Sequence, residues 1–157
     1  MRRVLGVDPG SSATGWALLV ASGGRSRLEE CGVIRPTGPD RAAKFADLYR
    51  RLLGIVETTE PDCAAVETPF GGRNPRSGLV LAESRGVILA ALGASRLAVH
   101  SYSPAQVKSA VVGNGQAEKR QVAFMIVRLL QLDTEPARDA SDAAAVALTH
   151  IHTARCR

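Results

Sequence analysis

The stretch Val4-Leu5-Gly6-Val7-Asp8-Pro9-Gly10 has the pattern of a strand that ends in a carboxylate and is followed by a turn. Apolar and small residues run up to Asp8, and Pro9-Gly10 supplies turn residues directly after it. Such a strand presents its carboxylate at the edge of a sheet. Taken alone, an aspartate before Pro-Gly is more often a turn residue than a metal ligand, so its role depends on what the fold brings beside it.

Two further strand-like runs follow, each separated from the preceding one by turn residues. Thr14 to Val20 resumes strand character, Ser22-Gly23-Gly24 makes a second turn, and Arg27 to Ile34 follows. These runs predict a three-stranded antiparallel meander. Asp40 is then expected to cap a helix that ends before Pro61, because apolar residues between them recur at three- and four-residue spacing.

The remainder of the chain predicts two more strands and four more helices. Cys63 to Glu67 is a short apolar run after a long helical crossover, which is typical of a buried parallel strand, and Leu97 to Tyr102 is a fifth strand. Because such crossovers are right-handed in nearly all cases, the Cys63 strand most simply lies beside the Val4 strand. Helices are expected over residues 77–92, 104–111, 118–130 and 137–153. The pattern predicts a mixed α/β fold.

Composition sets broad limits on the class of protein. A chain of 157 residues with 45% hydrophobic content fits a single domain, expected over residues 1–157. Its net charge of +5 permits a polyanionic partner without demanding one. Its three cysteines lack Cys-x-x-Cys spacing, which favours buried or inert thiols over a zinc or redox site. No uninterrupted apolar run approaches about 18 residues, so we expect a soluble, cytoplasmic protein without a membrane-spanning segment.

Four acidic residues on separate elements are expected to converge. Asp8 and Glu67 end neighbouring strands, while Asp139 and Asp142 project from the same side of the first turn of the last helix. Each alone fits a turn, a strand end or a solvated helix start. Packed together without cations, the four would repel and raise one another's pKa values. Two Mg²⁺ ions about 3.5 to 4 Å apart would remove that cost and support phosphodiester cleavage, so the acids and the basic balance suggest a nuclease.

Four sequence motifs follow one another along the chain. They are Val4-Leu5-Gly6-Val7-Asp8-Pro9-Gly10 with Thr14-Gly15, Ala65-Val66-Glu67 with Phe70, the segment from Gln106 to Lys119, and Asp139 to Ala143. In order and spacing they resemble the RuvC family of bacterial crossover junction endodeoxyribonucleases over essentially the whole chain. The resemblance implies a ribonuclease H-like fold, with a five-stranded mixed sheet of three antiparallel and two parallel strands flanked by helices.

The resemblance also implies an activity and partners. It implies paired, Mg²⁺-dependent incision of opposing strands of four-way Holliday junction DNA, in recombination and repair, with two Mg²⁺ per active site and Mn²⁺ as a substitute. It further implies a homodimer and partnership with the RuvA and RuvB branch-migration proteins. Matched residue by residue, the family's metal-binding acids fall on Asp8, Glu67, Asp139 and Asp142. Its catalytically supportive lysines, which also contact DNA, fall on Lys108 and Lys119.

The loop after Glu67 carries the remaining DNA-binding predictions. The family's aromatic residue that engages a base near the crossover falls on Phe70, although from the residues alone a local hydrophobic cap is equally good. Stacking on an unpaired base is worth roughly 1 to 3 kcal/mol. Arg73 and Arg76 flank it and are expected to hold phosphates rather than read bases. His150 and His152 fall on different faces of the last helix and are interpreted as structural.

Two other functions compete with a nuclease. Asp8-x-Gly10 followed by Thr14-Gly15 also resembles the first phosphate loop of actin-like and sugar kinases, but a phosphotransferase of that kind needs a second lobe for which this chain is too short. A junction-binding module without catalysis would fit the basic balance and the Phe70 loop. The presence of all four acids argues against it.

Overall fold

A single mixed sheet organises the chain. The computed structural model describes residues 1–68 and 75–155. Its strands are β1 (Arg2–Asp8), β2 (Thr14–Ser22), β3 (Arg25–Ile34), β4 (Cys63–Glu67) and β5 (Ala98–Tyr102), in the spatial order β3-β2-β1-β4-β5. The first three pair antiparallel, and β4 is parallel to both β1 and β5. The predicted sheet, including the place of the Cys63 strand beside the Val4 strand, is confirmed.

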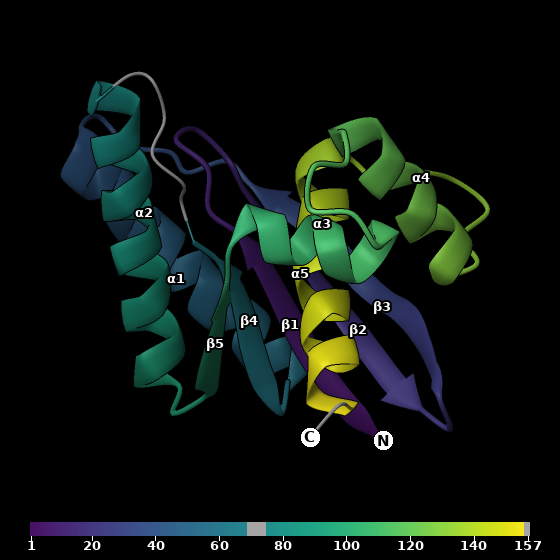
Figure 1. The fold of residues 1–157 in the computed structure, drawn as a ribbon. Helices are drawn as coiled ribbons and strands as arrows, with labels where there is room; N and C mark the ends of the chain where they lie inside the picture. The colour runs from purple at the N-terminus through teal and green to yellow at the C-terminus, as the bar shows by residue number, and fades with distance from the viewer. Residues whose placement is uncertain (69–74, 156–157) are drawn as a thin grey trace.

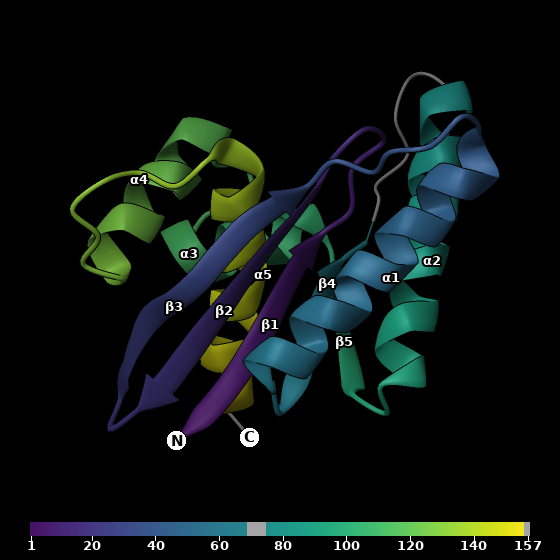
Figure 2. The ribbon, with the colours of Figure 1, turned by 180° about the vertical axis from the view of Figure 1, so that it is seen from behind.

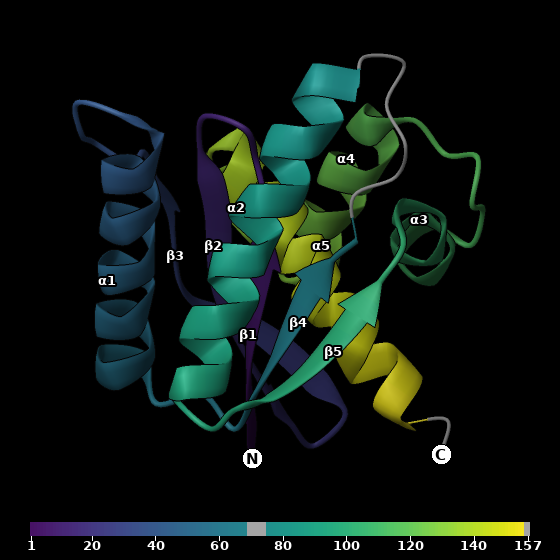
Figure 3. The same ribbon diagram turned by 90° about the vertical axis from the view of Figure 1, so that its left-hand side faces the viewer.

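Helices cover both faces of this sheet. The helices α1 (Arg41–Thr59) and α2 (Pro75–Ala94) lie on one face, and α5 (Arg138–Arg155) crosses the other, with α3 (Pro104–Val112) and α4 (Lys119–Leu129) packed against it (Figures 1 and 2). The side view in Figure 3 shows the strands between these two helical layers. The arrangement is therefore a three-layer sandwich of helices, sheet and helices.

Strand β1 is buried on both faces and contributes to two separate cores. Val4 belongs to the core beneath α3, α4 and α5, whereas Leu5 and Val7 belong to the core beneath α1 and α2. Successive side chains of a strand point to opposite faces, so this alternation divides one apolar run between two layers. The continuous apolar character of Val4–Val7 is what a central strand covered on both sides requires.

Two glycines let α5 approach the sheet closely. A Cβ on Gly6 would overlap the Ala143 carbonyl and Ala147, and a Cβ on Gly15 would overlap the backbone of Asp139. Only residues without a side chain fit at these two positions of β1 and β2. The contact seats the first turn of α5 over the carboxyl end of β1.

Helix starts follow the local signals in the sequence. The Asp40 carboxylate accepts a hydrogen bond of 2.7 Å from the Ala43 amide and caps α1. At α3, Ser103 and Gln106 form a reciprocal capping box, with Pro104 in the first turn. These caps satisfy amide donors that a helix start leaves unpaired, and the cap at Asp40 was predicted from residue types alone.

Helix α2 is more apolar along its length, and more exposed, than the sequence predicted. In the part of the chain that the structure describes, residues Ser77–Ala94 form one helix that is long and apolar enough, by length and composition only, to cross a membrane, with mean hydropathy 1.4. The prediction of no such candidate was wrong by this measure, because it required an uninterrupted run and did not allow for isolated charges such as Glu83 and Arg85. Only 22% of this window is buried, and Leu79 is 58% exposed. The helix thus carries apolar surface that the chain itself does not cover.

Candidate active site

The carboxyl ends of β1 and β4 hold two carboxylates side by side. Val7 pairs with Val66 in parallel register, and Asp8 and Glu67 are the next residue on each strand. Neighbouring strands lie about 4.8 Å apart, so the two side chains emerge at one edge of the sheet. The negative charge of Glu67 raises the pKa of Asp8, as expected for two acids in one place.

Helix α5 brings the other two acids to this edge. Burial, followed by the charges of Glu67, Asp142 and Asp139, raises the pKa of Asp8 from 3.8 to about 8, against a smaller opposing effect of Lys119. Burial and Asp142 likewise raise the pKa of Glu67. The structure therefore brings all four predicted acids together. Without a compensating cation the cluster is electrostatically unfavourable, and that is the condition that bound divalent metal ions relieve.

The two predicted lysines lie against the acids. Lys119 Nζ is 3.4 Å from a carboxylate oxygen of Asp142. Lys108 and Lys119 line a small cavity of about 50 Å³ together with Glu67 and Asp142. Both lysines also lower the pKa of Glu67, which opposes the larger upward shift that its burial causes. Helices α3 and α4 thus present one cation each to the acid cluster, on either side of the break at Gly113, whose φ is +83°.

Asp139 lies at the rim of the cluster. Its side chain is 39% exposed, and Arg35 at the end of β3 approaches one of its oxygens at 4.0 Å. Arg35 was not singled out by sequence reasoning. The signal available was its place directly after Ile34, at the same end of the sheet as Asp8 and Glu67, which becomes informative only once the antiparallel order of the strands is known.

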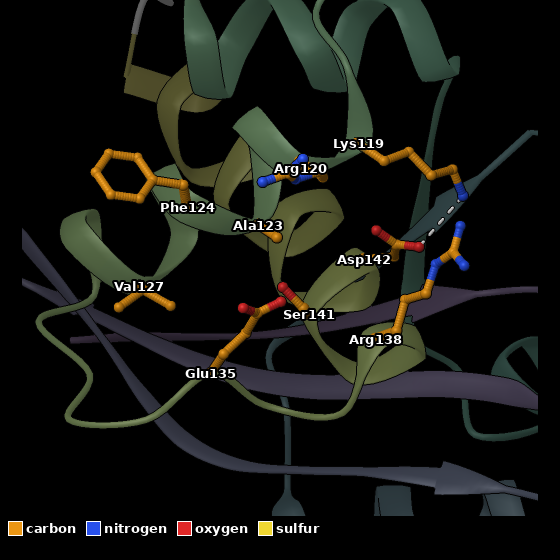
Figure 4. A pocket seen from close by; sticks show the side chains of 9 residues that line it. All are labelled: Lys119, Arg120, Ala123, Phe124, Val127, Glu135, Arg138, Ser141 and Asp142. Carbon is orange, nitrogen blue, oxygen red and sulfur yellow. Dashed lines mark hydrogen bonds and ion pairs between the residues drawn. The ribbon is translucent and has the colours of Figure 1, made fainter.

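A larger hollow with basic side chains adjoins the acids (Figure 4). This cavity of about 640 Å³ lies between α4 and the start of α5, and three basic residues, Lys119, Arg120 and Arg138, line it together with Phe124, Glu135 and Asp142. Figure 4 shows Lys119 and Arg138 both extending toward the side on which Asp142 lies. A polyanion that reaches Asp142 would therefore lie against fixed positive charge.

Sequence reasoning singled out Lys119 and Asp142 but none of the other residues that line this hollow. Phe124 is 61% exposed, and the Arg128 guanidinium carbon lies 5.8 Å from the centre of its ring. Phe124 lies off the helix face that buries Val122 and Ile126, as helical spacing predicts, but the spacing does not show that it lines a hollow beside the acids.

Three predicted DNA-binding positions cannot be placed. Phe70 and Arg73 lie outside the described residues, and so does the side chain of Arg76. Thr68, the last described residue before them, directly follows Glu67 and donates a 2.8 Å hydrogen bond from its amide to the Tyr102 carbonyl. The roles given to these three residues stay predictions.

A comparison with known protein families decides the affiliation of the chain. Residues 4–150 match the family model described as Crossover junction endodeoxyribonuclease RuvC. The chain belongs to the RuvC family. RuvC of Xanthobacter autotrophicus is 46% identical, with 96% of this chain and 89% of the relative covered. RuvC of Nitratidesulfovibrio vulgaris strain Hildenborough is 41% identical, with 97% of this chain and 92% of the relative covered.

Solved structures agree with the RuvC assignment. RuvC of Thermus thermophilus matches with a TM-score of 0.89 at 30% identity, covering 98% of this chain and 96% of its own. The same protein in complex with a Holliday junction substrate matches with a TM-score of 0.92, covering 99% and 96%. The yeast mitochondrial Holliday junction resolvase Ydc2, at 16% identity and a TM-score of 0.70, shares the fold. The predicted ribonuclease H-like fold is confirmed.

Proposed function

We propose that this protein is a structure-specific endonuclease that resolves four-way Holliday junctions by paired incision of opposing strands, in homologous recombination and DNA repair. The observation that carries the proposal is the convergence of Asp8, Glu67, Asp139 and Asp142 beside two lysines and a basic hollow. The solved complex of T. thermophilus RuvC with a Holliday junction supports the substrate class. The active unit in this proposal is one domain over residues 1–157.

The donor set at the acid cluster fits Mg²⁺. Its candidate ligands are carboxylates, whose hard oxygens Mg²⁺ and Mn²⁺ prefer over nitrogen or sulfur. The raised pKa values of Asp8 and Glu67 indicate that the cluster is short of positive charge, which two divalent cations would supply. Bound metal would lower the pKa of a water nucleophile and stabilise the leaving oxygen. Asp8 is the central ligand in this proposal because its pKa responds to the other three acids.

The other residues bind and orient the DNA. Lys119 and Lys108 hold the scissile phosphate against the acids and balance the charge that grows on its oxygens during cleavage. Phe70 stacks on a base exposed near the crossover, and Arg73 and Arg76 hold neighbouring phosphates. In the metal-free protein near neutral pH Asp8 holds a proton, which leaves to solvent when a cation takes its place.

Paired incision requires two active sites, so the proposal includes a homodimer. The apolar surface of α2 supports it, because Leu79 is 58% exposed and only 22% of the apolar window Ser77–Ala94 is fully buried. RuvA and RuvB are proposed as partners on the strength of the family resemblance. The proposed compartment is the bacterial cytoplasm, where the junction substrate is found.

Cleavage of a synthetic four-way junction tests the proposal. The wild-type protein is expected to cut the junction with Mg²⁺, to be inactive in EDTA, and to spare a linear duplex of the same sequence. Asp8→Asn is expected to lower cleavage by at least about 10³-fold while junction binding in Ca²⁺ is retained, because the carboxylate serves the metal rather than the scaffold. Asp133→Asn, at an exposed acid in the turn before α5, serves as the matched control.

Each outcome separates the alternatives. Junction binding without cutting by the wild type would favour the non-catalytic module. Nucleotide-dependent phosphoryl transfer without cutting would favour the kinase-like alternative. Full cleavage by Asp8→Asn would remove Asp8 from the mechanism.

A further inference from the structure

The far end of the same sheet holds a second cluster of metal-ligating side chains. It consists of Cys63 at the start of β4, His100 on β5 and His150 on α5. One ligand atom from each, the sulfur and two ring nitrogens, lie within 4.8 Å of one another. At about 3.3 Å of rise per residue, Cys63 lies roughly 13 Å from Glu67 at the other end of β4, so this cluster is separate from the acids.

The spacing of two of these atoms matches that of ligands on one metal ion. The Cys63 sulfur lies 3.5 Å from Nε2 of His150. With Zn–S of about 2.3 Å and Zn–N of about 2.0 to 2.1 Å in a tetrahedral site, two such ligands stand about 3.5 Å apart. The rings of His100 and His150 lie with centroids 4.2 Å apart and planes tilted by 32°, so His100 flanks the same point.

The hydrogen bonds of His150 leave its Nε2 lone pair aimed at the cluster. The Arg2 guanidinium lies 2.8 Å from Nε2, and since arginine can only donate, Nε2 must accept. Nδ1 then carries the proton and donates to the Tyr102 hydroxyl at 2.7 Å. This is the usual arrangement of a metal-binding histidine, whose second nitrogen is held by an acceptor that sets the tautomer. Burial, His100 and Arg2 lower the pKa of His150 to about 4, which keeps it neutral near pH 7.

A cation already stands between the sulfur and the imidazole. The same nitrogen of Arg2 that contacts His150 also lies 3.7 Å from the Cys63 sulfur. Cys63 and His150 are each 3% exposed, whereas Arg2 and His100 are exposed. The Cys63 sulfur and Nε2 of His150, both on buried residues, therefore point to one position, which is open to solvent on one side. The group now at that position is the guanidinium of Arg2, which belongs to an exposed residue of β1.

We propose that Cys63, His100 and His150 form a binding site for a borderline-soft divalent transition metal, with Zn²⁺ as the ion that its donors fit best. A sulfur and two imidazole nitrogens suit Zn²⁺ and exclude Mg²⁺, which prefers oxygen. Three protein ligands leave the fourth position for water. On binding, Cys63 loses its thiol proton to solvent, Arg2 moves away, and the ion joins β4, β5 and α5.

Co²⁺ gives a spectroscopic signal at this site that Co²⁺ bound to the acid cluster would not give. Co²⁺ bound to a cysteine sulfur gives a thiolate-to-metal charge-transfer absorption in the near ultraviolet, and Co²⁺ bound to carboxylates does not. The wild-type protein titrated with Co²⁺ is expected to develop this absorption until it saturates and to lose it when Zn²⁺ is added. Cys63→Ser should abolish it, and His100→Ala should weaken Co²⁺ binding at least tenfold.

Two further variants sharpen the test. Cys31→Ser with Cys156→Ser removes the other cysteines and should leave the absorption unchanged. Arg2→Ala should bind Co²⁺ more tightly than the wild type, because the competing cation is gone. Thermal unfolding of each variant verifies that it is folded. A folded wild type without the absorption, or an absorption that persists in Cys63→Ser, would overturn the site whatever the junction assay shows.

Discussion

Asp8 illustrates how far a single side chain depends on its surroundings. By sequence it ends a strand before a turn, where its carboxyl would ordinarily titrate near 3.8. Burial and three neighbouring acids raise that pKa to about 8 in the metal-free protein. Near neutral pH Asp8 therefore holds a proton, and a divalent cation at that position would compensate the negative charge of the cluster better than the proton does.

This shift predicts a pH dependence of stability in EDTA. Between about pH 4 and pH 8 the folded protein binds more protons at Asp8 than the unfolded chain does, so the free energy of unfolding falls as pH rises through this range. Asp8→Asn should remove that part of the fall and should be more stable than the wild type at pH 8. Urea unfolding of both proteins in EDTA measures the difference, and equal slopes of stability against pH would contradict it.

His150 changes the free energy of unfolding with pH in the opposite direction to Asp8, so the two effects must be measured separately. Its folded pKa of about 4 lies below its ordinary 6.5, so its contribution rises as pH rises from about 4 to 6.5 and is lost on acidification. Above pH 6.5 it is constant. Between pH 6.5 and 8.5, a comparison of the wild type with Asp8→Asn therefore reports the effect of Asp8. At lower pH both proteins contain His150, so its effect cancels in the difference between their free energies of unfolding.

At the scale of the elements, the position of α5 over the sheet completes the acid site. Gly6 and Gly15 allow it, since a Cβ at either would overlap backbone atoms of the helix. We expect Gly15→Ala to lower the free energy of unfolding by about 1 to 3 kcal/mol, as overpacking does in a filled interior. Because the contact is at Asp139, junction cleavage should fall as well. Urea unfolding and cleavage rates measure the two effects.

Gly54→Ala is the matched control for this prediction. Gly54 lies inside α1, and a Cβ there meets nothing within 4 Å. Alanine should raise stability by about 0.5 to 1 kcal/mol, because glycine is the poorer residue in a helix interior. If Gly15→Ala proved as stable and active as Gly54→Ala, close seating of α5 would not be what positions Asp139.

The elements also show what the sequence could and could not predict. Turn residues and the right-handed crossover were enough to predict the antiparallel meander and to place Glu67 beside Asp8. The hollow at Phe124 was not predictable, because it forms between α4 and the start of α5, and helical spacing does not say how two helices pack. The cluster at Cys63 was missed for a similar reason, since its three residues are distant in sequence and match no local ligand spacing. Local rules order the elements, and packing decides which distant side chains meet.

At the scale of the whole molecule, the two helical layers differ in what they expose. The layer of α3, α4 and α5 carries Asp139, Asp142, the two lysines and the larger hollow, and it lies over the strand ends that hold Asp8 and Glu67. The layer of α1 and α2 carries the uncovered apolar surface that includes Leu79. A dimer formed through α2 would leave both active sites accessible to DNA, and two copies would double the net charge of +5 available to a polyanion.

Leu79→Glu tests this arrangement, because a charge placed in an apolar interface is costly to bury. We expect the wild type to sediment as a dimer and Leu79→Glu as a monomer, with Leu129→Glu, at a 38% exposed residue of α4, unchanged. On a supercoiled plasmid with a cruciform, two coordinated cuts by the dimer yield linear DNA. The monomer should yield nicked circles, because it leaves before a second copy cuts the opposing strand. A Leu79→Glu protein that stays dimeric would place the interface elsewhere, and a monomeric wild type that still gives linear DNA would remove the need for a dimer.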